Sequence, residues 1–523
     1  MPVIVALLLA SLDGCPLRFL SVLVIVALHL VAASLTAAEP DLKGVFPCGC
    51  QVGTSCEIAL VGKGVDQGGS LYFTQEGLSA EHIEKDRFRI NVSTDSSLGD
   101  CELWLATPEG LAGPRRFSVT SNPVIVEQDS NDTRDQAQQI SIPSMIEARL
   151  DKAADLDWFA FEGQQEQLIT ITCRSASLDG SVQAAFTLFS PNGRELVHSS
   201  SREQEPRVTH KLPTTGTYRV LVHDRAYRKD DYSIYRLEVT TGSQDVASIE
   251  RTTGLLYPDD LFPAVAVQDE YEQSRQKPQS IELPSRIAGR LVERNEVDWF
   301  RFQAKKDETV HLEAFGERLG QLMDLEVAIY NTDNKLVTTI TDLASPKGVP
   351  ATLPLATLDP ASDWKAPADG EYSLAVRDLY GGSVFGADRV YELIVEAQRP
   401  HVIAVAMPAG TKPSRGVFVK RGGDAELALT VVRTGGFAVP VTVRAMETPN
   451  GLTVEPYVLD AKEITKAVKV SAAMDAQTGF HSLRLVVEAE IDSDTHTIPL
   501  LNAVLIRSGT TRRVDEMIIY VSE

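Results

Sequence analysis

The chain lacks most of the features that would mark a nucleic-acid-binding protein, a membrane transporter or a known type of enzyme. It has 50 basic residues against 72 acidic ones, and its net charge of −22 repels a phosphate backbone. After the first forty residues, no apolar run approaches the roughly 20 residues that cross a bilayer. The motifs of serine hydrolases, zinc proteases and phosphate-binding loops are missing. These absences predict a protein that binds no nucleic acid and is not an enzyme.

The first 38 residues have the pattern of an export signal. Arg18 supplies the positive flank, residues 19–33 are the apolar core, and residues 36–38 are a small-residue cleavage site. We therefore expect an exported protein, located in the periplasm, outside the cell or on its surface. The alternative is an uncleaved signal anchor over residues 19–38, which would attach the protein to a membrane.

The 523 residues that the chain contains predict several domains, because single domains cluster at roughly 100–150 residues. Hydrophobic residues make up 43% and charged residues 23%, an ordinary globular composition. The central half of the chain is an internal repeat, in which matching residues lie 141 positions apart (267 minus 126). The matched pairs are Val126 with Val267, Gln138 with Gln279, Ile140 with Ile281, Pro143 with Pro284, Ile146 with Ile287 and Leu150 with Leu291.

Two motifs define the repeat. The same offset places Asp-Trp-Phe-x-Phe at residues 157–161 and at 298–302, and after an insertion around residues 345–363 the register resumes at an offset of 154. A second motif, Gly-x-Tyr-x-(Val/Leu)-x-Val-x-Asp, then occupies residues 216–224 and 370–378. Apolar residues alternate in both motifs, which is typical of half-buried antiparallel strands, so the repeat is predicted to be a β-sandwich.

The regions that flank the repeats are also predicted to be β domains. Residues 39–122 contain short alternating strands separated by turns rich in Gly and Asp, and residues 400–523 contain another set. The predicted fold class is therefore all-β, with serial β-sandwich modules at 39–122, 124–240, 265–396 and 400–523.

The two motifs resemble those of the bacterial pre-peptidase C-terminal (PPC) domain. This resemblance covers residues 124–240 and 265–396 and implies a jelly-roll-like sandwich, with immunoglobulin-like domains on either side, as in multi-domain exported proteins of planctomycete-type bacteria. It implies a non-catalytic binding or structural protein that acts on an extracellular polymer or a partner protein. The alternative is an accessory or targeting subunit of a separately encoded secreted peptidase or other hydrolase.

The same resemblance implies calcium binding by an acidic cluster at one end of the sandwich. In the first repeat the matching residues are Glu127, Asp129, Asn131, Asp132, Asp155 and Asp157. At the 141 offset the second repeat has Gln268, Glu270, Glu272, Gln273, Glu296 and Asp298 instead. If either repeat binds calcium, we expect it to be the first. The alternative is a polar linker followed by a solvated turn.

Trp158 and Trp299 lie on the face opposite the core phenylalanines. We expect them to cover the edge of the sandwich or to pack on a neighbouring module; a platform for a sugar or peptide is the alternative.

Cys15 lies in the signal segment and Cys173 is predicted to be a buried thiol, so both are set aside. The four remaining cysteines lie in the first module. They are Cys48, Cys50, Cys56 and Cys101. Two disulfides fit an oxidising compartment, either 48–56 with 50–101 or 48–101 with 50–56, because a 48–50 bridge would be strained. Zinc binding by the four cysteines is the alternative.

Overall fold

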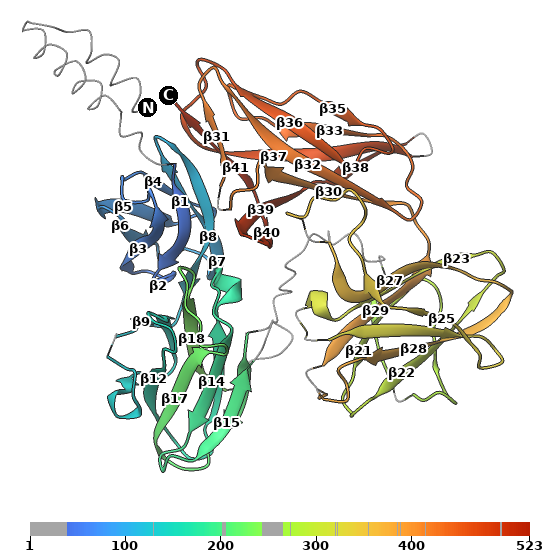
Figure 1. Ribbon diagram of the computed structural model, residues 1–523, viewed down its shortest axis with the longest axis horizontal. Helices are drawn as coiled ribbons and strands as arrows, with labels where there is room; N and C mark the ends of the chain where they lie inside the picture. The colour runs from blue at the N-terminus through green and yellow to red at the C-terminus, as the bar shows by residue number, and fades with distance from the viewer. Residues whose placement is uncertain are drawn as a thin grey trace, which may run out of the picture. The chain divides into compact units, whose positions relative to one another are not determined.

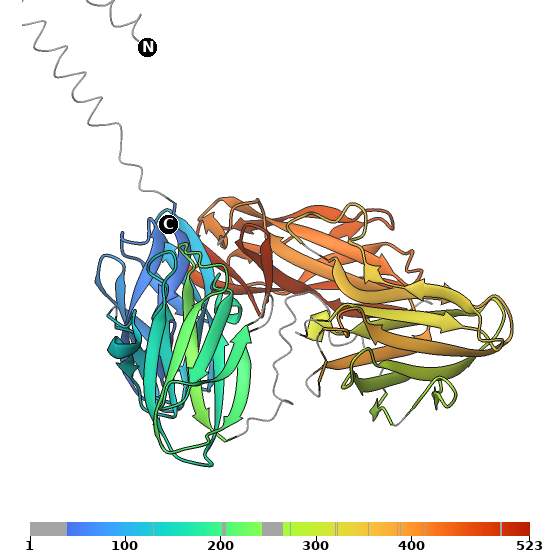
Figure 2. The same ribbon diagram turned by 60° about the horizontal axis from the view of Figure 1, so that its bottom comes forward.

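The computed structural model describes residues 39–523 apart from 129, 201–204, 243–264, 272, 320, 322, 354, 384, 387–388, 414 and 492–493. Strands and short 3-10 turns make up the regular structure of this described part, which contains no α-helix (Figures 1 and 2). The predicted all-β class of serial sandwiches is therefore confirmed. No helix within these residues is long and apolar enough to cross a bilayer. The predicted signal segment, 1–38, lies outside the described residues.

The N-terminal module packs two four-stranded sheets face to face, in the orders β1-β3-β6-β5 and β2-β8-β7-β4. Alternating side chains of strands such as β6, where Phe88 and Ile90 point inward, fill its core. Its strands are β1 (Asp41–Phe46), β2 (Gly49–Gln51), β3 (Ser55–Lys63), β4 (Ser70–Phe73), β5 (Leu78–Glu84), β6 (Arg87–Val92), β7 (Gly99–Thr107) and β8 (Gly110–Thr120).

The first repeat packs two five-stranded sheets, β10-β12-β17-β14-β15 against β16-β13-β18-β11-β9. Phe159 and Phe161 are fully buried between them, as the alternation predicts, and Cys173 is a buried free thiol beside them. The strands are β9 (Val124–Val126), β10 (Gln138–Gln139), β11 (Ser144–Arg149), β12 (Asp157–Gly163), β13 (Leu168–Arg174), β14 (Ala184–Phe189), β15 (Glu195–Ser200), β16 (Arg207–Lys211), β17 (Gly216–Asp224) and β18 (Ile234–Thr241).

The second repeat has the same two-sheet arrangement, β20-β22-β28-β24-β25 against β19-β21-β29-β23-β27-β26. Its core contains Phe300 and Phe302 at the positions of the first repeat's two phenylalanines. The strands are β19 (Val267–Asp269), β20 (Gln279–Ser280), β21 (Ser285–Arg290), β22 (Val297–Ala304), β23 (Thr309–Phe315), β24 (Leu325–Tyr330), β25 (Leu336–Ile340), β26 (Asp342–Leu343), β27 (Thr357–Lys365), β28 (Gly370–Asp378) and β29 (Val390–Ala397).

The C-terminal module contains the sheets β34-β36-β32-β30-β39-β40 and β31-β41-β37-β33-β35, with β38 paired to β37. Its strands are β30 (His401–Pro408), β31 (Val417–Lys420), β32 (Asp424–Thr434), β33 (Val441–Glu447), β34 (Leu452–Thr453), β35 (Tyr457–Leu459), β36 (Thr465–Ala472), β37 (Gly479–Ile491), β38 (Asp494–Pro499), β39 (Leu501–Arg507), β40 (Thr510–Val514) and β41 (Met517–Ser522).

The 141-residue offset is wrong at the start of the repeat. Val124 pairs with Met145 in the first repeat, and Val267 pairs with Arg286 in the second. Met145 and Arg286 are 141 positions apart, so Val267 corresponds to Val124, at an offset of 143, and not to Val126. The loop that follows this short strand is two residues shorter in the second repeat. A sequence comparison without gaps cannot detect a change inside a polar loop, because no core residue there fixes the register.

The insertion in the second repeat has a packing role. Leu353 and Leu355 are buried against side chains of β30, β32 and β39, and the Thr511 hydroxyl donates a hydrogen bond to the carbonyl of Thr352. The inserted segment thereby covers an apolar face of the C-terminal module that would otherwise be exposed to water.

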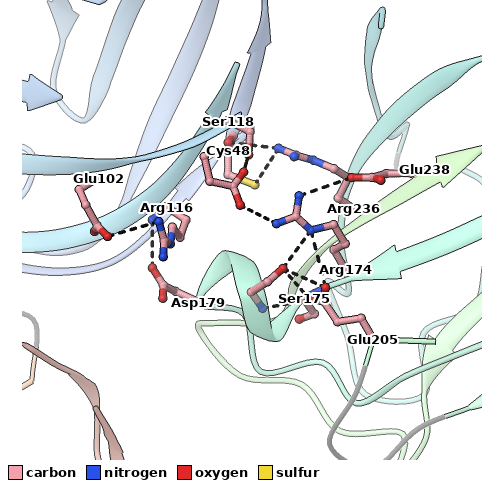
Figure 3. A network of polar contacts seen from close by, with 12 residues as sticks. Cys48, Glu102, Arg116, Ser118, Arg174, Ser175, Asp179, Glu205, Arg236 and Glu238 are labelled. Carbon is pink, nitrogen blue, oxygen red and sulfur yellow. Dashed lines mark hydrogen bonds and ion pairs between the residues drawn. The ribbon is translucent and has the colours of Figure 1, made fainter. Parts of the chain in front are cut away.

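Polar contacts join the N-terminal module to the first repeat, among them that of Arg236 with Cys48 (Figure 3). Arg236 and Glu147, both 1% exposed, form an ion pair within the repeat, with 2.7 Å between Nε and Oε1. Both residues reach Cys48 of the first module, whose thiol donates to Glu147 Oε2 at 2.9 Å and whose carbonyl accepts from Arg236 at 3.3 Å. Nearby, Arg174 Nη2 lies 2.6 Å from Asp100 Oδ2.

A second group of charges links three modules. Asp179 of the first repeat accepts a hydrogen bond from the backbone N–H of Arg116 at 2.9 Å and another from Arg512 Nη2 at 3.2 Å. Arg512, from the C-terminal module, also donates to Glu102 of the first module at 2.9 Å. Apolar contacts accompany these pairs, since Trp104 of the first module is buried with Ile506 of the last.

We expect Glu147→Ala to destabilise the protein by about 3–5 kcal/mol, because it leaves Arg236 buried without its carboxylate. Chemical denaturation, followed at the transition that includes the first repeat, measures this effect. Lys43→Ala is the control: it removes an ion pair between the same two modules, but a solvent-exposed one, and should cost no more than about 1 kcal/mol. Equal effects of the two changes would contradict the role assigned to burial.

Candidate functional site

Three of the predicted calcium ligands come together at one end of the first repeat. Carboxylate oxygens of Asp132, Asp155 and Asp157 all lie within 4.8 Å of one another, and Asp155 and Asp157 are buried. Asp157 begins β12, while Asp132 lies in the loop between β9 and β10. Strand pairing therefore brings together side chains that are far apart in the sequence.

The loop before β12 holds Asp155 in place. Its Oδ2 accepts the backbone N–H of Asp151 at 2.8 Å, a turn that the left-handed Ala154 (φ 57°) allows. The ammonium of Lys152 contacts Asp132 and lies 3.5 Å from Asp155 Oδ1. A lysine thus supplies positive charge at the position where a bound cation would lie.

Glu127 adds a fourth carboxylate, and it faces Asp157. Its Oε2 accepts the backbone N–H of Arg149 at 2.9 Å, and its Oε1 accepts from the side-chain amide of Asn131 at 3.0 Å. On its other side, Asp157 accepts a 2.5 Å hydrogen bond from the hydroxyl of Tyr235, which lies on β18 of the opposite sheet. The predicted residue Asp129 lies outside the described residues.

Burial makes this pair of acids difficult to ionise. It raises the pKa of Asp157 to about 9, with repulsion from Glu127 as the next cause, and it raises the pKa of Glu127 to about 7. Burial therefore favours the protonated form in this pair when no cation is near. A divalent cation would replace that proton, and four carboxylates suit the oxygen preference of Ca²⁺. The residues present therefore fit a calcium ion.

The second repeat has the acid pair but a different loop. Glu270 accepts the backbone N–H of Arg290, as Glu127 does with Arg149, so Glu270 and not Gln268 is its counterpart. Asp298 accepts a hydrogen bond from Tyr391 at 2.6 Å, and burial raises its pKa to about 8.

The remaining ligand positions of the second repeat are occupied differently. The side-chain oxygen of Gln273 accepts the N–H of Trp299, whereas in the first repeat the backbone carbonyl of Asn131 accepts the equivalent N–H of Trp158. Glu296 accepts the N–H of Glu293. Within the described residues, only the first repeat gathers three metal-ligating side chains.

Sequence reasoning missed Tyr235, Tyr391 and Lys152. Both tyrosines stand at the matching start of a strand in each repeat, Tyr235 in Tyr-x-Leu-x-Val and Tyr391 in the same pattern. That repetition was a signal that the residue has a role beyond core packing.

The two tryptophans pack on aromatic rings of their own sheets. Trp158 lies against Phe189, with ring centroids 5.3 Å apart, and Trp299 lies against Tyr330 at 5.4 Å. The guanidinium of Arg275 lies over Trp299, 5.3 Å from the ring centroid. All four rings are half-buried. These contacts are with the outer face of the same sandwich rather than with a neighbouring module.

Cys48, Cys50, Cys56 and Cys101 of the first module are free thiols in the structure. Cys48 is directed at Glu147 of the next module. The pairings 48–56 with 50–101 and 48–101 with 50–56, and the alternative of a zinc site, stay predictions. The thiols of Cys50 and Cys56 lie within hydrogen-bonding reach of each other.

No family model and no curated protein matches the chain. Among solved structures, the pre-peptidase C-terminal domain of a Bacillus anthracis collagenase aligns at 15% identity over 24% of this chain and 99% of its own, with a TM-score of 0.18. A Bacteroides ovatus protein of a mixed-linkage glucan utilization locus, SGBP-B, aligns at 10% identity over 39% of this chain and 77% of its own, with a TM-score of 0.15. Tripeptidyl peptidase 2 aligns at 9% identity over 87% of this chain and 39% of its own, with a TM-score of 0.13.

We expect Asp157→Asn to stabilise the calcium-free protein at pH 8 by about 1–3 kcal/mol. Folding raises the pKa of Asp157 from 3.8 to about 9, so its contribution to stability is full below pH 4 and is lost as the pH rises to 9. An asparagine has no charge to lose and still accepts from Tyr235, so its advantage should vanish towards pH 4. Thermal unfolding in EDTA across this range measures the difference.

Asp298→Asn is the matched variant in the second repeat. It should show the same trend between pH 4 and 8, because the pKa of Asp298 is raised to about 8. A loss of stability in Asp157→Asn at pH 8 in EDTA would contradict the buried-charge argument.

Proposed function

We propose that the chain is an exported, non-catalytic protein whose β-sandwich surfaces bind an extracellular polymer or partner protein, and whose first repeat binds one calcium ion. The observation that carries the proposal is the excess of buried carboxylates at one end of that repeat. Asp132, Asp155 and Asp157 converge there, with Glu127 facing Asp157. A cation that these groups bind would fix the loop between β9 and β10 against the start of β12.

The contacts across the module boundaries support a structural role. Glu147 and Arg236, both 1% exposed, lie at the boundary between the N-terminal module and the first repeat. Leu353 and Leu355 are buried at the boundary between the second repeat and the C-terminal module. Contacts of this kind hold neighbouring sandwiches together and would keep their binding surfaces in place. Loops at the ends of such sandwiches are the usual places for binding residues.

Calcium should raise the melting temperature of the protein, because a ligand that binds only the folded state stabilises it by about 2.7 kcal/mol at a hundred times its Kd. Thermal unfolding in calcium, in magnesium and in EDTA measures the effect. Asp155→Asn should abolish the calcium-dependent shift, whereas Asp298→Asn in the second repeat should retain it. A wild-type protein that melts at one temperature in all three buffers would overturn the calcium part of the proposal.

Co-sedimentation with insoluble peptidoglycan, cellulose or fibrillar collagen tests the binding role separately. Retention on one of these polymers, greater in calcium than in EDTA, is the expected result. If calcium raises the melting temperature but the protein sediments with none of these polymers, the calcium site is retained. An extracellular polymer is then excluded as the ligand.

Lys152→Ala should increase the affinity for calcium. The ammonium of Lys152 contacts Asp132 and Asp155, so it competes with an incoming cation for the same oxygens. Isothermal titration of the variant and the wild type measures the change, and Lys211→Ala, which removes an exposed lysine from another strand of the same repeat, is the control. Weaker calcium binding by Lys152→Ala would show that the lysine supports the site instead of competing for it.

A further inference from the structure

Cys50 and Cys56 face each other across the sandwich of the N-terminal module. Cys50 lies on β2, in register with Val119 of one sheet, and Cys56 lies on β3, in register with Ile90 of the other. Both side chains pack in the same core, Cys50 fully buried and Cys56 at its margin. The two thiols therefore come from opposite sheets and meet at one edge of the sandwich.

The turn between them is held by the strands around it. The N–H of Val52 donates to the carbonyl of Thr120, and the N–H of Val92 donates to the carbonyl of Thr54, both at 2.9 Å. Inside the turn, the hydroxyl of Thr54 donates to the carbonyl of Gln51 at 2.7 Å and lies 3.7 Å from the sulfur of Cys50. Because both sheets anchor the turn, the approach of the two thiols is part of the fold.

Cys101 cannot take the place of Cys56. It lies on β7, and β8 separates β7 from β2. Two strand spacings amount to roughly 9.6 Å, whereas the Cα atoms of a disulfide lie less than about 7 Å apart. Among the alternatives that the sequence left open, only the bridge between Cys50 and Cys56 agrees with the geometry.

A pocket of about 200 Å³ opens beside the pair. Cys50 and Cys56 line it together with Thr54, Glu57 and Val126. Both residues thus line one pocket, and Cys56, the less buried of the two, gives an oxidant access to the pair from solvent.

We propose that Cys50 and Cys56 are a redox site, converted to an intramolecular disulfide by exchange with glutathione disulfide or an oxidised dithiol protein. The thiolate of one cysteine of the pair attacks one sulfur of the oxidant, whose S–S bond breaks and releases a thiolate. The other cysteine then gives its proton to water and attacks the sulfur of the first, which releases the second thiolate. The two cysteines lose two electrons, and the oxidant gains them as two thiols.

The contact between the two thiols favours the thiolate of one of them, because it lowers the pKa of Cys50 and raises that of Cys56. The site is independent of the proposed calcium ion, which binds another module.

The test is to incubate the folded protein with glutathione disulfide, alkylate the remaining thiols after unfolding, and map the peptides by mass spectrometry without reduction. We expect Cys50 and Cys56 to be bridged within the single tryptic peptide 44–63, as fragmentation locates, with Cys48, Cys101 and Cys173 alkylated. Alkylation of Cys50 and Cys56, a lasting glutathione adduct on Cys50, or a bridge to Cys48 or Cys101 would each overturn the proposal.

Two variants test the pair. Cys50→Ser and Cys56→Ser should each abolish the bridge, and the variant that stops at a glutathione adduct identifies the thiol that attacks first. Cys173→Ser, which changes a buried thiol of the first repeat, is the matched control and should form the bridge like the wild type. A bridge from the remaining cysteine to Cys48 or Cys101 in either variant would contradict the pairing. If either variant fails to fold, the peptide map of the wild-type protein still decides between bridge and no bridge.

Discussion

A buried carboxylate at the start of one strand, bonded to a tyrosine on the opposite sheet, organises the acidic end of both repeats. Asp157 bonds to Tyr235 and Asp298 bonds to Tyr391, in each case across the sandwich. A single hydrogen bond does not compensate a charge in this position, because burial penalises the ionised form. In both repeats a second acid lies beside this carboxylate, and in the first repeat a lysine adds positive charge to the cluster.

The alternation of apolar residues was sufficient to predict the β class and the cores. Phe159, Phe161, Phe300 and Phe302 are all buried as expected, because an inward side chain at every second position is a local property of a strand. The acidic cluster was only partly predictable. Asp155 and Asp157 were predicted from the family resemblance, but the partner of Asp157 on β18 depends on which strands face each other, and a single sequence does not specify this.

The errors occurred where no core residue constrains the chain. The offset of 141 does not hold in the polar loop after Val267. The counterpart of Glu127 was therefore assigned to Gln268, two residues before its position at Glu270. The sequence also left the pairing of the cysteines open. Their number and spacing allowed several pairings, while the fold directs Cys48 out of its own module and towards Glu147. Contacts between modules leave almost no trace in the local pattern of a sequence.

The two repeats show how one scaffold can keep a buried acid pair and change what neutralises it. Both have the Glu–Asp–Tyr arrangement, so that arrangement belongs to the sandwich itself. The first repeat adds Asp132 and Lys152, whereas the second has Glu293 at the position of that lysine and directs Glu296 at the backbone of the same residue. Asp155 is shorter than Glu296 and keeps its second oxygen near Asp132 and Asp157. Within the described residues, the three-carboxylate cluster of the first repeat therefore depends on Asp132 as well as on the shorter side chain of Asp155.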